Sequence, residues 1–208
     1  MTAYIWDLDG TLLDSYGVIV AATAETVRSA GLADDAETIL RMIKKTALTA
    51  YLKTCAERSG MPFERLLEHY RLLTHEMDGS ITLMNGAEEA LEALKKRGAE
   101  HYVYTHRGES SEPILKRLGI LHYFRETVTS VYGLPPKPSG AGVRYLTKKY
   151  GLDPEKTWYV GDRPIDILCG KDAGVKAMLL LPEGAPVQPT GMEDRIIRSL
   201  WELKEEER

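Results

Sequence analysis

Short apolar runs and longer amphipathic segments alternate along much of this chain, which is the pattern of strands followed by helices. The first apolar run, at 3–6, has the length of a buried strand. Later runs of similar length are separated by segments in which apolar residues recur every three or four positions. We expect further strands at 102–105, 128–131, 158–160 and 177–181, and helices that end near 98 and 119 or span 141–150, 165–173 and 192–203.

The stretch 14–82 interrupts this alternation, because its apolar residues recur at helical spacing throughout. Gly31 and Gly60 are typical of positions just after a helix. Asp34 and Glu37 form a pair that resembles a capping box at the start of another helix. These signals predict about four helices with no strand between them.

The order of these elements predicts the fold class. A strand at the start, followed later by alternating strands and helices, indicates an α/β fold with a doubly wound, parallel, Rossmann-like sheet. The helical stretch is then an insertion between the first strand and the rest. We therefore expect a core domain of residues 1–13 and 83–208 and an inserted, all-α helical-bundle cap domain of residues 14–82.

Charge and composition narrow the function classes. The net charge is −4 and the basic residues are spread along the chain, so no nucleic-acid partner is expected. Cys55 and Cys169 lie too far apart in the sequence to suggest a disulfide framework or a zinc site. No apolar span is long enough to cross a membrane, and the first strand begins too close to Met1 for a secretion signal. We expect a cytoplasmic monomer or homodimer that does not bind membranes.

Two acidic residues, Asp7 and Asp9, follow the first predicted strand, at the end where open α/β sheets bind ligands. Strand geometry directs both side chains to the same side, and Gly10 lets the backbone turn away. Two carboxylates this close repel each other unless a cation lies between them or one holds a proton. A divalent metal ion and a proton-carrying partner would meet both conditions, although an Asp-Gly turn after a strand is also common.

Later loops carry further candidate residues. The hydroxyl of Thr105, with the backbone N–H groups after it, suits phosphate oxygens. Lys137 lies in a proline-rich loop, where its ammonium could neutralise a phosphoryl group. Asp162 and Asp166 follow a predicted strand and offer hard oxygen ligands of the kind that Mg²⁺ prefers. Each residue alone is also compatible with an ordinary role, such as ending a strand, lying on the surface or capping a helix.

Residues 7–12 (DLDGTL) resemble the opening motif of the haloacid dehalogenase superfamily, a large group of aspartate-nucleophile phosphohydrolases. Thr105, Lys137, and Asp162 with Asp166 four residues later resemble the second, third and fourth motifs of that superfamily, in the same order. A helical cap inserted after the first strand is similar to the subgroup of phosphoglycolate phosphatases and β-phosphoglucomutases, which acts on small phosphorylated molecules. The acid at Asp9 favours phosphate chemistry, since the dehalogenases of the superfamily lack it.

The resemblance implies a Mg²⁺-dependent phosphatase that hydrolyses a small phosphorylated metabolite through an aspartyl-phosphate. It makes Asp7 the nucleophile and Asp9 the general acid and then the general base. The residues that it assigns to the phosphate are Thr105, His106 and Lys137; the metal ligands are Asp7, Asp9 through its backbone carbonyl, and Asp162, with Asp166 beside them or bound through water.

One segment departs from the pattern of the superfamily. His106 and Arg107 stand where a small polar residue would be expected after Thr105. Arg107 either adds positive charge near the phosphate and favours multiply anionic substrates, or is an exposed arginine before a helix.

Other functions remain open on the same scaffold. A sugar-phosphate mutase would share Asp7 and Asp9. A phosphonate hydrolase would use a cap lysine as a Schiff-base former, for which Lys44, Lys45 and Lys53 are candidates. A non-catalytic phosphate-binding regulator would keep the fold alone. A receiver domain is disfavoured because its phosphoacceptor lies on a later strand and it has no helical insertion.

Overall fold

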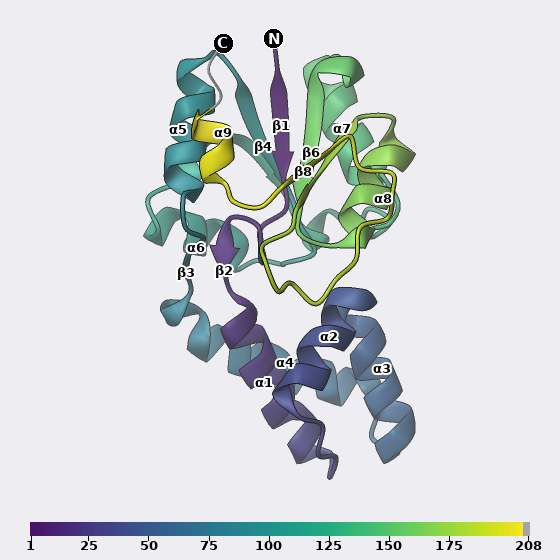
Figure 1. The fold of residues 1–208 in the computed structure, drawn as a ribbon. Coiled ribbons are helices and arrows are strands. Elements are labelled where there is room, and N and C mark those ends of the chain that lie inside the picture. Colours follow the sequence, from purple (N-terminus) through teal and green to yellow (C-terminus); the bar gives the residue numbers. More distant parts are fainter. Residues whose placement is uncertain (206–208) are drawn as a thin grey trace. The chain divides into compact units, whose positions relative to one another are not determined.

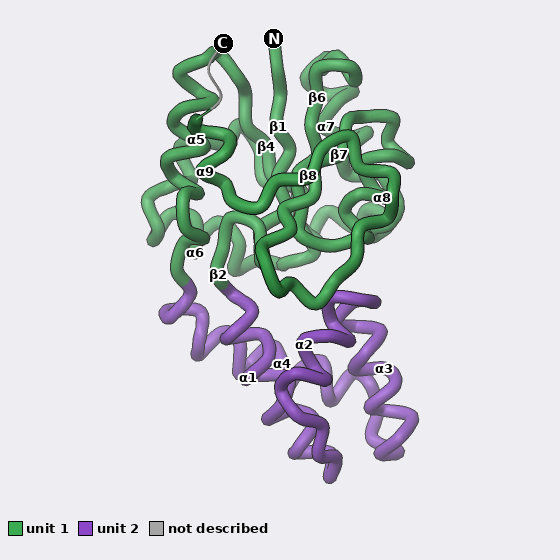
Figure 2. Tube along the Cα trace, in the orientation of Figure 1, with its two compact units in different colours: residues 1–14, 82–208 green, residues 15–81 purple. Residues whose placement is uncertain are grey.

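The computed structural model describes residues 1–205. The chain divides into two compact units: Met1–Asp14 together with the chain from Thr82 onward, and Ser15–Ile81 (Figure 2). The first unit contains the sheet, and the second contains helices. The hydrophobic pattern of the sequence alone places the corresponding boundaries at 13/14 and 82/83.

The main sheet of the described chain has six strands, all parallel, in the order β5-β4-β1-β6-β7-β8. This order confirms the predicted doubly wound α/β fold. The strands are β1 (Ala3–Trp6), β4 (Glu100–Tyr104), β5 (Phe124–Val128), β6 (Thr157–Gly161), β7 (Lys176–Leu180) and β8 (Arg195–Ile197). Because β1 lies between β4 and β6, the residues that follow these three strands come together at one edge.

Helices flank this sheet (Figure 1). They are α5 (Ala87–Lys96), α6 (Ser111–Arg117), α7 (Ala141–Tyr150), α8 (Pro164–Ala173) and the short α9 (Trp201–Glu205). Ile5 packs in one core cluster with Val143 and Leu146 of α7 and Cys169 of α8. Its neighbour Trp6 points to the opposite face, as the alternation of side chains along a strand requires. A two-stranded antiparallel ribbon of β2 (Leu13–Asp14) and β3 (Thr82–Leu83) lies where the chain leaves and re-enters this unit.

The second unit consists, in its described residues, of four helices, as the sequence predicts: α1 (Tyr16–Ser29), α2 (Ala36–Lys45), α3 (Leu48–Ser59) and α4 (Phe63–Met77). Its core includes Ile19, Ile39 and Leu66. The predicted capping residue is wrong by one position: Asp35 accepts the hydrogen bond from the backbone N–H of Thr38. Asp34 instead binds partners on α3, which sequence spacing could not reveal.

Two predicted elements differ in the structure. The strand expected at 128–131 is β5, which ends at Val128, and a 3₁₀ turn Ser130–Tyr132 follows it. The helix expected at 192–203 is wrong, because this segment forms β8, pairs with β7 and only then begins α9. Ile196 is exposed and Ile197 is buried, which is the alternation of an edge strand. Pairing with the open edge of the sheet therefore overrode the helical spacing of the apolar residues.

Candidate active site

The candidate residues lie at the carboxyl ends of adjacent strands. Asp7 follows β1, Thr105 follows β4, and Asp162 follows β6. Backbone pairing aligns the three strands, with Trp6 opposite both Val103 and Val160. The N–H of Asp7 continues this pairing by donating to the carbonyl of Val160 at 2.8 Å. Three predicted site residues thus lie at neighbouring strand ends, because their strands are neighbours in the sheet and not in the sequence.

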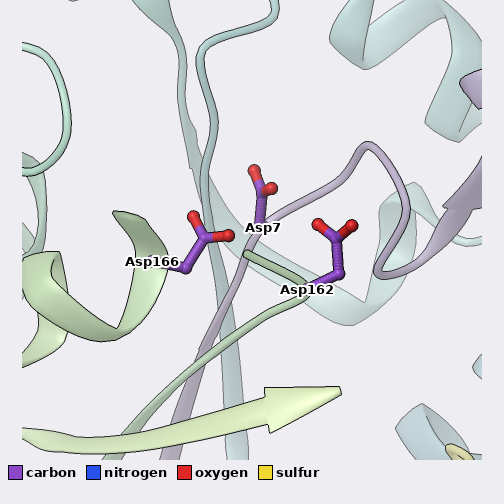
Figure 3. A group of neighbouring side chains, drawn as sticks. All are labelled: Asp7, Asp162 and Asp166. Atoms are coloured by element: carbon purple, nitrogen blue, oxygen red, sulfur yellow. The ribbon is translucent and has the colours of Figure 1, made fainter. Parts of the chain in front are cut away.

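Asp7, Asp162 and Asp166 form a compact carboxylate cluster (Figure 3). One ligand oxygen from each lies within 4.8 Å of the others, and all three side chains are buried. Oδ2 of Asp7 is buried and accepts no hydrogen bond from any described residue. Three carboxylates at such distances repel each other strongly in a buried setting, and carboxylate oxygens are hard ligands. The cluster therefore suits a metal ion, which would satisfy the orphaned oxygen and offset the charge.

Glycine at position 161 allows this cluster to be compact. A Cβ built there would overlap the carboxylate of Asp166. The Asp166 side chain occupies that space and accepts a hydrogen bond from the N–H of Arg163 at 3.1 Å, which caps α8. Asp166 thus caps α8, one of the two roles expected for it, and the same side chain lies in the acidic cluster.

Lys137 reaches the cluster from the loop before α7. Its buried Nζ lies 2.8 Å from Oδ1 of Asp7 and 2.7 Å from Oδ1 of Asp166. The ammonium also lies 5.5 Å from the centroid of the Tyr104 ring and 5.2 Å from that of Tyr159, within cation–π range. Two carboxylates and two aromatic faces therefore hold the lysine charge in place.

The charged groups in this network alter one another's pKa values. Burial raises the pKa of Asp7 to about 6, against the opposing charge of Lys137. Burial disfavours the lysine ammonium, but the charges of Asp166 and Asp7 outweigh it and raise the pKa of Lys137. Burial also disfavours the charged form of Asp166, yet Lys137 and Arg163 outweigh it and lower the pKa of Asp166. Lys137 and Asp166 are thus an ion pair at neutral pH, with Asp7 the more basic carboxylate.

Asp9 is held by an ion pair that the sequence did not reveal. Nη2 and Nε of Arg107 lie 2.7 Å and 3.1 Å from Oδ1 of Asp9, and Nη1 donates to Oγ of Ser110 at 3.2 Å. The Arg107 side chain is only 8% exposed. The alternative of an exposed arginine before a helix is therefore wrong.

Thr105 and His106 both contact the loops around them. Oγ1 of Thr105 accepts from the N–H of Arg107 at 3.1 Å. Nε2 of His106 accepts from the N–H of Lys137 at 2.9 Å. Burial, with the nearby charges of Lys137 and Arg163, lowers the pKa of His106 to about 3, so the ring is neutral with its proton on Nδ1. The imidazole thus links the Thr105 loop to the backbone of the lysine.

Arg163, Tyr104 and Tyr159 also belong to this site, although the sequence pattern does not predict them as site residues. Arg163 directly follows Asp162, so its place beside a motif residue was a signal that could have singled it out. The two tyrosines belong to β4 and β6, where aromatic residues are usual, so only the structure associates them with Lys137.

An open parallel α/β sheet whose strand ends gather buried aspartates around a lysine is the arrangement of a class of enzymes with an acidic, metal-binding site. The chain belongs to the haloacid dehalogenase-like hydrolase family, whose model matches residues 4–180. This membership confirms the family expected from the four motifs. Together, the family and the buried aspartate cluster indicate a metal-dependent enzyme.

Named relatives and solved structures agree with this assignment. A phosphoglycolate phosphatase of Agrobacterium fabrum is 31% identical over 184 residues, 84% of this chain and 78% of that protein. The pyrophosphatase PpaX of Bacillus velezensis is 30% identical over 179 residues, 85% of this chain and 81% of that protein. The crystal structure of a predicted phosphoglycolate phosphatase from Haemophilus somnus has the same fold, with a TM-score of 0.81, 24% identity, and coverage of 96% of this chain and 95% of that one. A hydrolase from Streptococcus pneumoniae is 32% identical, with a TM-score of 0.60, and the match covers 85% of this chain and 90% of that one.

Proposed function

We propose that this protein is a Mg²⁺-dependent phosphatase that hydrolyses a small phosphomonoester through an aspartyl-phosphate on Asp7. The observation that carries the proposal is the buried Asp7 carboxylate, with one oxygen against Lys137 and the other without a hydrogen bond from the described residues. A carboxylate in this setting is fixed in position and poorly solvated, as a nucleophile should be. The relatives named as phosphatases support the same reaction class.

The two steps of the reaction use Asp7 and Asp9. In the first, a carboxylate oxygen of Asp7 forms a bond to phosphorus while the bond from phosphorus to the ester oxygen breaks, and Asp9 gives its proton to the departing oxygen. In the second, Asp9 takes a proton from water, the water oxygen bonds to phosphorus, and the Asp7 carboxylate is released. Asp9 thus ends protonated, as it began.

The metal site proposed for Mg²⁺ uses Asp7, Asp162 and the backbone carbonyl of Asp9. Asp166 stands beside it, because its two oxygens already accept hydrogen bonds from Nζ of Lys137 and the N–H of Arg163. The ion would offset negative charge on the transferring phosphoryl group. Oxygen donors alone fit a hard cation such as Mg²⁺ better than zinc.

The phosphate oxygens would be held by groups that follow β4 and by a lysine in the loop before α7. Lys137 supplies a fixed positive charge, and the hydroxyl of Thr105 with the turn after it supplies donors. His106 positions the backbone of Lys137 and, being neutral, offers Nδ1–H as a donor. Arg107 contributes through Asp9, and its charge favours anionic substrates.

We propose different roles for the two units. The unit that contains the sheet is the catalytic core domain, and the helical unit 15–81 is a cap that selects the substrate and excludes water. No helix in the described part of the chain is long and apolar enough to cross a membrane. We further propose a cytoplasmic enzyme, monomeric or homodimeric, that acts on a small phosphorylated metabolite.

The test is release of inorganic phosphate from a panel of phosphorus compounds by wild type and Asp7→Asn, with Mg²⁺ or with EDTA. The panel contains an aryl phosphate, 2-phosphoglycolate, pyrophosphate, hexose phosphates and a phosphonate, since the relatives are named for differing substrates. We expect metal-dependent turnover that falls by at least about a thousandfold in Asp7→Asn while the fold is retained. Full activity in that variant would contradict the proposal. Isomerisation of a sugar phosphate or cleavage of the phosphonate alone would move the assignment to a mutase or a phosphonate hydrolase.

A further inference from the structure

Arg163 lies against all three carboxylates of the acidic cluster. Its Nη2 is 3.6 Å from Oδ2 of Asp7, and its Nε is 3.9 Å from Oδ1 of Asp162 and 3.7 Å from Oδ2 of Asp166. The side chain is 9% exposed, so its charge is largely removed from water. None of the roles proposed above uses this guanidinium.

Arg163 and Lys137 meet the cluster in different ways. Lys137 makes hydrogen bonds of 2.7 and 2.8 Å and contacts the Oδ1 atoms of Asp166 and Asp7. Arg163 contacts the Oδ2 atoms of the same two residues at distances beyond a good hydrogen bond. The lysine is therefore held against both carboxylates by hydrogen bonds, whereas the contacts of the arginine with the same two carboxylates are mainly electrostatic.

The atom that Arg163 faces on Asp7 is the oxygen that a metal ion would need. Oδ2 accepts no hydrogen bond from the described residues, and the guanidinium is a cation that the structure brings near it. The charges also balance closely: three carboxylates are offset by Lys137 and Arg163, which leaves one negative charge before any ion binds. An additional divalent ion must share this space and this charge with the arginine.

We propose that the Arg163 guanidinium is the built-in counter-cation of the Asp7, Asp162 and Asp166 cluster, and that it sets the affinity for the divalent ion by competing with it. The inference rests on the metal site of the proposed function. In the metal-free protein the guanidinium stabilises the cluster. When the ion binds, the guanidinium loses its ion pairs with Asp7 and Asp162, and their loss weakens metal binding.

The side chain of Arg163 can be tested apart from its backbone. The N–H of Arg163 caps α8 through Asp166, and this contact does not depend on the side chain. Arg163→Gln removes the charge and keeps a polar side chain, whereas Arg163→Lys keeps the charge. Arg144→Gln is the matched control, because Arg144 pairs with Asp172 on the exposed outer side of α7 and α8.

The experiment titrates Mg²⁺ into metal-free protein by calorimetry and records thermal unfolding with and without the ion. We expect Arg163→Gln to bind Mg²⁺ on the order of tenfold more tightly than wild type, and to unfold at a lower temperature in EDTA. Arg163→Lys and Arg144→Gln should bind the ion within about twofold of wild type. Mn²⁺ should give the same ranking.

Two results would overturn the inference. Equal or weaker Mg²⁺ binding by folded Arg163→Gln would show that the arginine does not compete with the ion, while leaving the metal site intact. Absence of binding in every form would remove both the metal site and the inference. If Arg163→Gln does not fold, NMR of the wild type replaces it. The Nε–H signal of Arg163 should shift when Mg²⁺ is added, whereas that of Arg144 should not. An unchanged Arg163 signal would contradict the inference.

Discussion

The guanidinium of Arg107 lies against the carboxylate of Asp9, with Nη2 at 2.7 Å and Nε at 3.1 Å from the same oxygen. The two residues come from the loops after β4 and β1, so the neighbouring strands bring them together. Two nitrogens on one oxygen fix the position of this carboxyl group, whose other oxygen, Oδ2, can carry the proton. Arg107 is therefore expected to act mainly through Asp9.

We expect Arg107→Met to lower kcat by about 10- to 100-fold with a smaller change in KM, because the proposed general acid loses its anchor. Arg107→Lys should be intermediate, since a lysine keeps the charge but not the two-point contact. Steady-state kinetics on the best ester of the panel measures both, with Arg144→Met as the surface control. A rise in KM at constant kcat would instead assign Arg107 to the substrate, and no change in either would remove it from the site.

The protonation of Asp7 predicts an effect of pH on stability in the absence of metal. Burial raises the pKa of this carboxyl from 3.8 to about 6. Between those values the native state binds more protons than the unfolded state, so the free energy of unfolding falls as pH rises from about 4 to 6. The asparagine of the Asp7→Asn variant does not titrate, so the free energy of unfolding of the variant lacks this pH dependence. Its stability relative to wild type should therefore increase across this window, by at most about 3 kcal/mol.

Urea unfolding of wild type and Asp7→Asn in EDTA, at intervals between pH 4 and 7, measures this difference. Other titrating groups are common to both proteins and largely cancel. A difference that stays flat across the window would contradict the predicted burial of charge at Asp7. Saturating Mg²⁺ should stabilise wild type and have little effect on the variant, because the ion offsets the same charge.

Asp34 is predicted to stabilise the helical unit. Its carboxylate accepts hydrogen bonds from Nη1 and Nη2 of Arg58 and from the hydroxyl of Tyr51. These bonds, Arg58 first, lower the pKa of Asp34 to about 2. We expect Asp34→Asn to reduce the free energy of unfolding at neutral pH by about 1–2 kcal/mol, discounted because Arg58 is partly exposed.

The stability that Asp34 contributes changes with pH in the opposite direction from the stability that Asp7 contributes. A depressed folded pKa contributes stability that is present above about pH 4 and is lost as the pH falls toward 2. Asp35→Asn is the matched control, since asparagine caps a helix about as well as aspartate. Denaturant curves at pH 7 and pH 3 should show a loss for Asp34→Asn that shrinks at the lower pH. Equal stability of both variants at pH 7 would count against the Asp34 network.

Gly142 is predicted to be required for the packing beneath Lys137. A Cβ built at Gly142 would overlap the ring of Tyr104, one of the two rings that face the lysine. Gly142→Ala should therefore lower the free energy of unfolding by about 1–3 kcal/mol, as overpacking does, and should also reduce turnover. Gly17→Ala is the control, because nothing lies within 4 Å of its Cβ position. Thermal unfolding compares them, and a neutral Gly142→Ala would show that the ring moves freely.

Much of the site could be predicted from the sequence because its residues follow strands. Asp7, Thr105 and Asp162 were found from apolar runs that end in polar residues, and parallel strands bring such ends together. Lys137 is indicated only weakly by its proline-rich loop, and the order of the motifs supplies the stronger signal. The segment at 192–203 was predicted wrongly, since its apolar spacing suits a helix, whereas pairing with the open edge of β7 made it a strand.

The sequence by itself determined the alternating α/β pattern, the helical insertion and the chemical identity of the residues at the strand ends, because these depend on local periodicity and on side-chain type. The tertiary structure alone decided which charges meet: Arg107 with Asp9, Lys137 with Asp7 and Asp166, and Arg163 with all three clustered carboxylates. Most of these contacts join loops far apart in the chain, and the direction of a long cationic side chain depends on burial and on competing charges. No local pattern of residues carries that information.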